Sequence, residues 1–282
     1  MEKTKRNHVL ITGATGGLGK AFAVECASRG WDLFLTDLND ATLAVLAEGL
    51  QKTYGVEVIT YACDLTDEDA RAKLCETLYK NNWRFGILIN VAGTDYEGPF
   101  YERTREQIRT IVRLNIEGTL EMTHAVMGIR DPYTTLLIIN VASLAAFYPM
   151  PVKAIYAASK RFILDFTLAL REEVRPLGAT VTALCPAGLP TNKECIQGIE
   201  AQGLIGQLTT QNIGSVAAMT VDYALKGRAV CIPGLLNQIF QFLGNLLPSS
   251  FLAWLIGRRW QETHQKSQES PAWRATAHQV EL

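Results

Sequence analysis

The stretch "HVLITGATGGLGKAF", residues 8–22, decides the fold of this chain. A short apolar run is followed by a glycine-rich turn and then by a helical pattern. Glycine allows the backbone to turn tightly and to approach a phosphate closely, and the start of the following helix offers unpaired N–H groups to negative charge. A strand, a glycine turn and a helix in this order predict the opening βαβ unit of a dinucleotide-binding fold. We expect the pyrophosphate to lie against Gly13, Thr15, Gly17, Leu18 and Gly19.

Short apolar runs alternate with longer amphipathic ones beyond this stretch. The runs are rich in Val, Ile and Leu with little polar alternation, which is typical of strands covered on both faces. They predict an α/β protein of one domain, a Rossmann fold with a doubly wound parallel sheet of about seven strands. The expected strands are 8–12, 32–37, 56–63, 85–93, 134–143, 180–188 and 229–234. We assign residues 1–234 to this domain, 235–262 to a helical extension packed on it, and 263–282 to a polar tail that is loosely ordered.

The composition excludes several classes of function. With 282 residues, 48% of them hydrophobic, the chain can bury a substantial core, and its net charge of -1 gives no reason to expect a nucleic-acid partner. The six cysteines form no C-x-x-C pair and the four histidines show no ligand spacing, so we expect reduced thiols and no metal. The first apolar run, 9–11, is too short for a signal peptide, which predicts a cytoplasmic protein.

An acidic residue ends the second expected strand. The Asp37 carboxylate can accept hydrogen bonds from both adenosine ribose hydroxyls and would repel a 2′-phosphate, so the sequence favours NAD(H) over NADP(H). The alternative role of helix N-cap fits Asn39 or Asp40 better. At the end of the third strand, Asp64 with Leu65 is placed to contact the adenine, although a capping role for Asp64 is equally open.

Several further motifs appear in a fixed order along the chain. They are the glycine turn in the form T-G-x-x-x-G-x-G, "NVAG" at 90–93, Asn115 in "RLNIEG", Ser143 in "NVASLAAF", Tyr156 and Lys160 in "YAASK", and "CPAGLPTN" at 185–192. Over residues 7–234 the chain resembles the short-chain dehydrogenase/reductase family. Its last segment resembles the DltE-like bacterial branch of that family, which is related to hydroxysteroid dehydrogenases and 3-oxoacyl reductases.

The side chains of "YAASK" suit acid–base chemistry on an alcohol or ketone. Tyr156 and Lys160 are four residues apart and share one helix face. A nearby ammonium favours the phenolate, so Lys160 would lower the pKa of Tyr156 toward neutral pH. General acid–base transfer works best when the catalytic pKa lies near the operating pH. Ser143 would donate a hydrogen bond to the substrate oxygen.

The resemblance implies further roles. Lys160 would hydrogen-bond the nicotinamide ribose, and Asn115 would hold a water that relays protons from Lys160. Ser159 and Ala158 are expected to serve helix packing only. Residues Asn90, Ala92 and Gly93 would form the floor of the cofactor cleft, and Pro186, Gly188 and Thr191 would embrace the nicotinamide. The family pattern after the sixth strand is P-G, whereas this chain has "PAG", a departure that leaves the individual contacts of this segment open.

The loops expected around the nicotinamide are apolar. They cover residues 93–101, 144–155 and 189–212, and they contribute Tyr96, Phe100, Phe147, Tyr148, Met150, Ile155, Ile196, Ile199, Leu204 and Ile205. Such a lining favours a bulky hydrophobic substrate, although the same residues could equally pack the loops onto the core. Beyond them, 235–260 predicts two amphipathic helices broken at Pro248, the second closed by Arg258 and Arg259. These helices could cap the pocket, form a subunit contact or lie on a bilayer, in that order of preference.

The sequence thus favours an NAD(H)-dependent oxidoreductase that interconverts a secondary alcohol and a ketone on a hydrophobic scaffold such as a hydroxysteroid. It is expected to form a homodimer or homotetramer. One alternative is reduction of a 3-oxoacyl thioester, for which the basic residues near the cleft mouth, Lys153, Lys193 and Arg103, are sparse. Another alternative is a redox sensor that binds the dinucleotide without turnover. The chain retains the whole catalytic set, which disfavours this alternative.

Overall fold

The chain folds around one parallel sheet of seven strands. The computed structural model describes residues 8–191 and 209–268. The strand order is β3-β2-β1-β4-β5-β6-β7, which confirms the predicted doubly wound Rossmann sheet. The strands are β1 (His8–Thr12), β2 (Asp32–Asp37), β3 (Val58–Ala62), β4 (Ile87–Asn90), β5 (Leu136–Val141), β6 (Ala179–Leu184) and β7 (Val230–Cys231).

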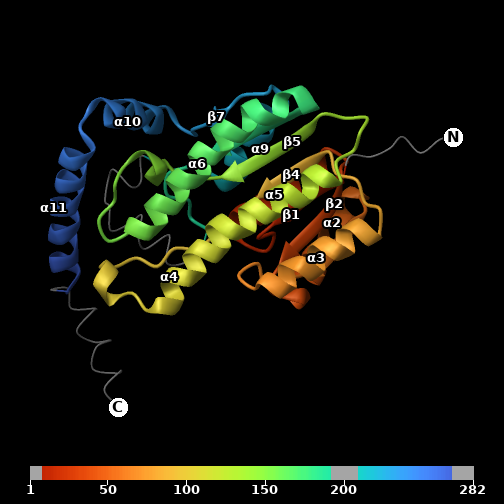
Figure 1. Ribbon diagram of the computed structural model, residues 1–282, viewed down its shortest axis with the longest axis horizontal. Helices are drawn as coiled ribbons and strands as arrows, with labels where there is room; N and C mark the ends of the chain where they lie inside the picture. Colours follow the sequence, from red (N-terminus) through yellow and green to blue (C-terminus); the bar gives the residue numbers. More distant parts are fainter. Residues whose placement is uncertain (1–7, 192–208, 269–282) are drawn as a thin grey trace, which may run out of the picture.

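Helices cover both faces of the sheet, as Figure 1 shows. The helices and helical turns are α1 (Gly17–Ser28), α2 (Asp40–Tyr54), α3 (Glu68–Lys80), η1 (Phe100–Glu102), α4 (Arg105–Ile111), η2 (Val112–Gly118), α5 (Thr119–Gly128), η3 (Leu144–Phe147), α6 (Ala154–Val174), η4 (Arg175–Leu177), α9 (Ile213–Leu225), α10 (Leu235–Leu246) and α11 (Ser249–Gln268).

Alternation along β1 divides the core into two layers. Val9 and Ile11 belong to the cluster that includes side chains of α1, α2 and α9, whereas Leu10 belongs to the cluster with α3 and α5. Successive side chains of a strand point to opposite faces, so the unbroken apolar run of β1 supplies both layers at once. Because all the strand pairs are parallel, the carboxyl ends of the strands lie at the same end of the sheet, where ligands of such folds bind.

The expected strands are present, but most are shorter than predicted. The fourth was expected over 85–93, yet β4 ends at Asn90. The reason is a side chain: the Thr12 hydroxyl accepts hydrogen bonds from the backbone N–H groups of Val91 and Ala92, at 3.1 and 3.2 Å. The chain is thereby turned over the end of β1 instead of continuing the strand.

The C-terminal segment forms two helices separated at Pro248, as predicted. The second differs from the expectation, because α11 continues through Gln268 instead of closing at Arg258 and Arg259. The stretch 261–268 contains neither glycine nor proline, so nothing in it stops the helix. The first residues of the expected polar tail are thus helical, and 269–282 lie outside the described residues. Within the described ranges, no helix combines the length and apolar character needed to span a membrane.

The described cysteines are free thiols, in line with the prediction; Cys195 lies outside the described residues. Burial raises the pKa of Cys185 to about 12 and that of Cys231 to about 11. Both thiols therefore stay protonated at neutral pH and act as small apolar side chains.

Candidate active site

The glycine turn after β1 is shaped by close backbone contacts. Gly13 has φ +64°, and a Cβ on it would lie 2.8 Å from the Cα of Ala92. A Cβ on Gly19 would overlap the backbone of Gly13. Helix α1 starts behind Gly16, so no N-cap side chain covers its first N–H groups, while Leu18 is buried in the helix. This cradle fits a dinucleotide pyrophosphate, which needs open N–H groups and close backbone approach.

Asp37 holds the glycine turn against the end of β2. Its Oδ2 accepts hydrogen bonds from the backbone N–H and the hydroxyl of Thr15, at 2.8 and 2.7 Å, and its Oδ1 accepts one from the N–H of Leu38 at 2.7 Å. These three contacts fix the position of the Asp37 side chain at the turn. The structure thus places a negative charge where the sequence predicts ribose recognition, and the neighbouring Leu38 is exposed and uncharged. Asn39 caps α2 by accepting from the N–H of Thr42, as expected.

The expected adenine contacts lie at the next strand end. Asp64 accepts hydrogen bonds from the N–H and hydroxyl of Thr66, at 2.8 and 2.7 Å, which is a local turn and supports the capping alternative. Leu65 is buried, and its carbonyl accepts a hydrogen bond from Arg71 at 2.8 Å. Sequence reasoning missed Arg71, because nothing in its spacing links it to the strand end.

The segment after β6 lies over the glycine turn. A Cβ on Gly17 would sit 2.9 Å from the Cα of Thr191, so these two backbones are in direct contact. The carbonyl of Pro186 accepts a hydrogen bond from the N–H of Leu144 at 2.8 Å, which ties the segment to the loop after β5. Gly188 is exposed between these two anchor points. The structure places Thr191 against the turn, whereas its predicted nicotinamide contact stays a prediction.

Asn90 points into the helical layer. Its Nδ2 donates to the Thr123 hydroxyl at 3.0 Å and to Asn140 Oδ1 at 2.9 Å, and Asn140 in turn donates to the Thr167 hydroxyl at 3.0 Å. All four side chains are buried. Asn90 therefore fastens β4 to β5 and their covering helices, and Asn140 and Thr167 are members of this network that the motif did not reveal.

Ser143, Tyr156 and Lys160 lie around the carboxyl end of β5. Ser143 follows the strand and its Oγ accepts a hydrogen bond from the N–H of Ala145 at 3.1 Å, which leaves the hydroxyl proton available to a ligand. Tyr156 is in the first turn of α6 and Lys160 in the next. The Lys160 Nζ lies 5.8 Å from the centroid of the Tyr156 ring and donates to the carbonyl of Val141 at 2.8 Å. The predicted helical pair is thus formed beside β5.

The environment of Lys160 is unfavourable for its charge. The side chain is 5% exposed, and burial lowers its pKa to about 8. A Cβ on Gly93 would lie 3.2 Å from the Lys160 Nζ and 3.2 Å from Asn115 Oδ1. A side chain at position 93 would therefore fill the space between these two groups, which explains on steric grounds why the residue is glycine.

Asn115 joins the loop after β4 to α6. Its Oδ1 accepts from the N–H of Thr94 at 2.8 Å, and its Nδ2 donates to the Thr94 carbonyl and to the Ser159 hydroxyl, each at 3.0 Å. Ser159 donates onward to the carbonyl of Tyr156 at 2.7 Å. Ser159 therefore does more than the helix packing expected of it: it connects Asn115 to the tyrosine turn. The Asn115 backbone carbonyl accepts from the Thr119 hydroxyl at 2.9 Å, and the predicted water contact of Asn115 stays a prediction.

An ion cluster pins the loop after β4 to the start of α6. The Lys153 Nζ lies 2.8 Å from both Asp95 Oδ2 and Glu97 Oε2. Burial alone would lower the pKa of Lys153, but the two carboxylates outweigh it and hold that pKa above its ordinary value. The Gly98 N–H also donates to the carbonyl of Val152 at 2.8 Å. The Lys153 ammonium is thus engaged by two carboxylates of the protein itself.

The apolar lining is only partly enclosed. Phe100 is 60% exposed, whereas Tyr96, Phe147, Tyr148, Met150 and Ile155 are half-buried. Among the described residues the buried Tyr148 hydroxyl has no hydrogen-bond partner, and burial raises its pKa to about 12. The expected lining residues Ile196, Ile199, Leu204 and Ile205, as well as Lys193, lie outside the described residues.

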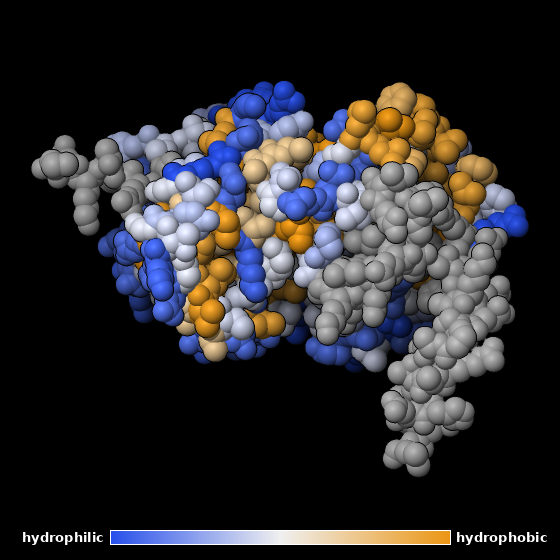
Figure 2. Space-filling view, turned by 180° about the vertical axis from the view of Figure 1, so that it is seen from behind, coloured by the Kyte–Doolittle hydropathy of each residue, from blue (hydrophilic) through white to orange (hydrophobic). Residues whose placement is uncertain are grey.

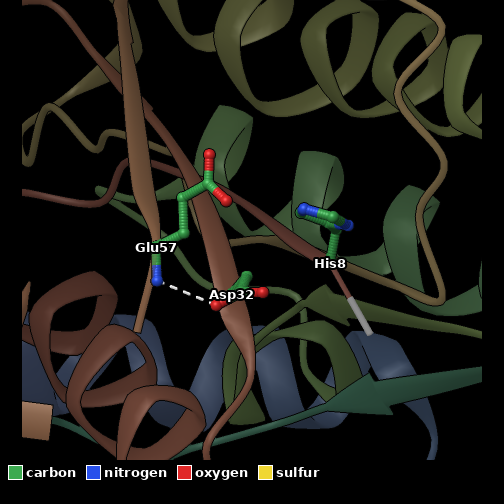
Figure 3. A group of neighbouring side chains, drawn as sticks. All are labelled: His8, Asp32 and Glu57. Atoms are coloured by element: carbon green, nitrogen blue, oxygen red, sulfur yellow. Dashed lines mark hydrogen bonds between the residues drawn. The ribbon is translucent and has the colours of Figure 1, made fainter. Parts of the chain in front are cut away.

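A second polar group lies at the opposite, amino ends of the strands. His8 and Asp32 begin β1 and β2, Glu57 directly precedes β3, and their ligand-type atoms lie within 4.8 Å of one another (Figure 3). The sequence did not reveal this group, because strand pairing brings the three residues together. Asp32 accepts a hydrogen bond from the Glu57 N–H at 2.8 Å, a contact that holds β3 against β2.

The site combines a glycine turn, an acidic residue at the end of β2, and a serine, a tyrosine and a lysine at the end of β5. This combination defines the class of dinucleotide-binding oxidoreductases built on a Rossmann sheet. Residues 7–195 match the family model of the short chain dehydrogenases, and the chain belongs to this family.

Known proteins resemble the chain in both sequence and structure. It is 34% identical over 177 residues to a very-long-chain 3-oxoacyl-CoA reductase of Laccaria bicolor, covering 62% of this chain and 52% of the relative. The chain spans about half the length of this relative and of the corresponding protein of Coprinopsis cinerea.

Solved structures of known proteins resemble the chain over most of its length. A bulky-bulky ketone specific alcohol dehydrogenase of Comamonas testosteroni has 27% identity and a TM-score of 0.73, covering 87% of this chain and 96% of that one. A short-chain dehydrogenase of Sphingobium yanoikuyae in complex with NADPH has 29% identity and a TM-score of 0.72, covering 86% and 96%. A Burkholderia phymatum family member in complex with NAD, at 22% identity and a TM-score of 0.74 over 86% and 94%, shares the fold. The narrower placement in the DltE-like branch stays a prediction.

Proposed function

We propose that the chain is an oxidoreductase that interconverts the 3-oxo and 3-hydroxy forms of a long-chain acyl thioester. The observation that carries the proposal is the similarity to very-long-chain 3-oxoacyl-CoA reductases together with the Ser143, Tyr156 and Lys160 arrangement. The sequence alone favours a hydroxysteroid, but an apolar lining suits a long acyl chain as well as a steroid, so it does not separate the two. The comparisons favour the acyl reading, which the sequence ranked second.

The residues divide the chemistry between them. Bound nicotinamide supplies or accepts the hydride. The Ser143 hydroxyl donates to the substrate oxygen, where negative charge develops during reduction. Tyr156 delivers the proton to that oxygen, and the Lys160 ammonium beside it makes the phenol easier to ionise.

We further propose NAD(H) as the preferred cofactor. The support is local: the Asp37 carboxylate lies at the end of β2 against the glycine turn, and Leu38 beside it offers no positive charge to a 2′-phosphate. The similar dehydrogenase of Sphingobium yanoikuyae was solved in complex with NADPH, so the preference of this chain is to be measured with both cofactors. The cytoplasmic location and the homodimer or homotetramer also stay predictions.

The test compares substrates and cofactors on the purified full chain. NADH and NADPH consumption is measured with long-chain 3-oxoacyl-CoA, ketosteroids and aliphatic ketones. We expect turnover of the acyl thioester with NADH, and we expect Tyr156→Phe to lower it by about a hundredfold or more while NADH binding, followed by fluorescence, persists. Faster turnover of ketosteroids would restore the hydroxysteroid reading. Preference for NADPH would contradict the role of Asp37, and NADH binding without turnover of any substrate would favour the redox sensor.

A further inference from the structure

Helices α10 and α11 present their apolar faces to solvent. In α10 the exposed side chains are Leu235, Ile239, Phe242, Leu243 and Leu246, which are spaced as one helical face. In α11 they are Phe251, Trp254 and Leu255. Phe242 is 61% exposed and Trp254 is 53% exposed. This orientation is the reverse of a surface helix in a globular protein, whose apolar face points inward.

Figure 2 shows the result as a continuous hydrophobic area over these two helices, at the upper right of that view. We call these eight side chains the α10–α11 patch. Large contiguous apolar areas of this kind mark contact with a protein or a membrane.

The opposite sides of the helices are fixed to the protein. A Cβ on Gly244 would overlap the ring of Tyr148, and one on Gly257 would lie 3.3 Å from Pro151. Asn237 is buried and donates to the carbonyls of Thr209 and Pro233, at 3.1 and 2.7 Å. The outward direction of the patch is therefore set by packing on the loop between Ser143 and Tyr156.

Charge and residue type favour lipid over protein as the partner. Residues 235–260 contain no acidic residue, and their only charges are Arg258 and Arg259. The Arg258 guanidinium lies 5.1 Å from the centroid of the exposed Trp254 ring, at one end of the patch. Aromatic and aliphatic side chains on one face with basic residues at its border are typical of helices that lie in a bilayer interface. A protein partner would require more polar groups, because protein interfaces carry about one hydrogen bond per 100–200 Å².

We propose that the α10–α11 patch docks onto the surface of an anionic lipid bilayer. The helices lie in the plane of the interface, with the patch among the acyl chains and Arg258 at the headgroups. Docking brings the loop 144–151 close to the membrane. The proposal goes beyond the proposed reaction, and its test does not use activity.

Flotation of the full-length protein with vesicles tests the docking. We expect co-flotation with vesicles of phosphatidylcholine and phosphatidylglycerol, and weaker co-flotation with phosphatidylcholine alone. The double variant Phe242→Ser/Trp254→Ser should lower the partition by about tenfold or more. Val45→Ser/Leu177→Ser, which alters side chains exposed elsewhere, is the matched control and should float like the unchanged chain.

The oligomeric state, measured by light scattering after size exclusion, separates lipid from a second copy of the chain. Loss of flotation with an unchanged oligomeric state supports the proposal. Absence of flotation in the unchanged chain overturns it. A lower oligomeric state of the Phe242→Ser/Trp254→Ser variant with unchanged flotation also overturns it and assigns the patch to a subunit interface.

Discussion

Lys160 occupies a place that opposes its own charge. It is 5% exposed, and burial lowers its pKa from 10.5 to about 8. A shift of this size means that burial destabilises the Lys160 ammonium, relative to the neutral amine, by about 3 kcal/mol. The folded protein therefore loses stability by keeping an ammonium next to Tyr156, a cost typical of residues selected for chemistry rather than for packing.

The first prediction concerns Lys160→Met. Because the variant removes the buried charge, its free energy of unfolding at pH 7 should be higher by about 1–2 kcal/mol, less than the full shift since the Val141 carbonyl loses its donor. Between pH 8 and 10.5 the unfolded chain binds more protons at Lys160 than the folded chain does. The stability of the unchanged protein should thus rise with pH in this window relative to the variant.

Denaturant unfolding at several pH values measures this difference, and NADH consumption should be lost in the same variant. Lys20→Met, which removes the positive charge of an exposed lysine, is the control and is measured over the same pH range. A stability gap that stayed constant from pH 7 to pH 10 would contradict the lowered pKa of Lys160.

Among residues, the proximity of Tyr156 and Lys160 could be predicted from the sequence because their spacing on one helix face is local. The supporting residues could not. Ser159 looked like packing, and Arg71 and Asn140 carry no motif, because their roles arise from contacts between distant segments. Side-chain pairing across a fold is invisible until the strands and helices have been placed.

At the scale of elements, η2 (Val112–Gly118) is a π-helical segment between α4 and α5, and it carries Asn115. A π turn widens the helix and is common at functional sites. Here it accompanies the placement of the buried Asn115 side chain against Thr94 and Ser159. The apolar pattern of the sequence has no marker for the one inserted residue of such a π turn.

Arg71 joins α3 to α5 and to the loop after β3. Its Nε and Nη2 bind both oxygens of Glu121 at 2.7 and 2.8 Å, its Nη2 also lies 3.3 Å from Glu117, and its Nη1 holds the Leu65 carbonyl. The Arg71 side chain is 2% exposed. One side chain thus couples the expected adenine contact to the helix that follows η2.

Arg71→Lys should therefore destabilise the protein by about 1–3 kcal/mol, because an ammonium cannot reproduce the fork of hydrogen bonds. It should also weaken NADH binding more than it changes kcat. Arg161→Lys is the matched control: its pair with Asp165 is 56% exposed on both sides and should contribute roughly 0–1 kcal/mol. Equal melting temperatures for the two variants would show that the buried cluster adds nothing to stability.

At the scale of the whole molecule, the sheet was predictable because its strands are short, mostly apolar runs separated by longer helical patterns. The strand ends were not, as Thr12 shows by diverting Val91 and Ala92. The predicted extension after residue 234 exists, but the direction of its apolar faces depends on packing against Tyr148 and Pro151. Hydrophobic periodicity predicts which side of a helix is apolar, but it does not predict whether that side packs on the protein or faces solvent.

Gly244 tests this attachment. Gly244→Ala should force the Tyr148 ring to move, lower the stability by about 1–3 kcal/mol and raise KM for a bulky substrate. Gly49→Ala in α2 is the control: a Cβ there meets nothing within 4 Å, so the change should stabilise the helix by about 0.5–1 kcal/mol. Thermal unfolding measures both. A Gly244→Ala variant as stable as the Gly49→Ala variant would mean that α10 is not anchored on this loop.

The strand order has a consequence for synthesis of the chain on the ribosome. β1 lies between β2 and β4, so β1, β2 and β3 can pair before the second half of the chain emerges. Until residues 87–90 appear, one edge of β1 remains open to pairing with other nascent chains. β4 closes this edge of β1, and a delay before β4 is translated exposes the growing protein to aggregation.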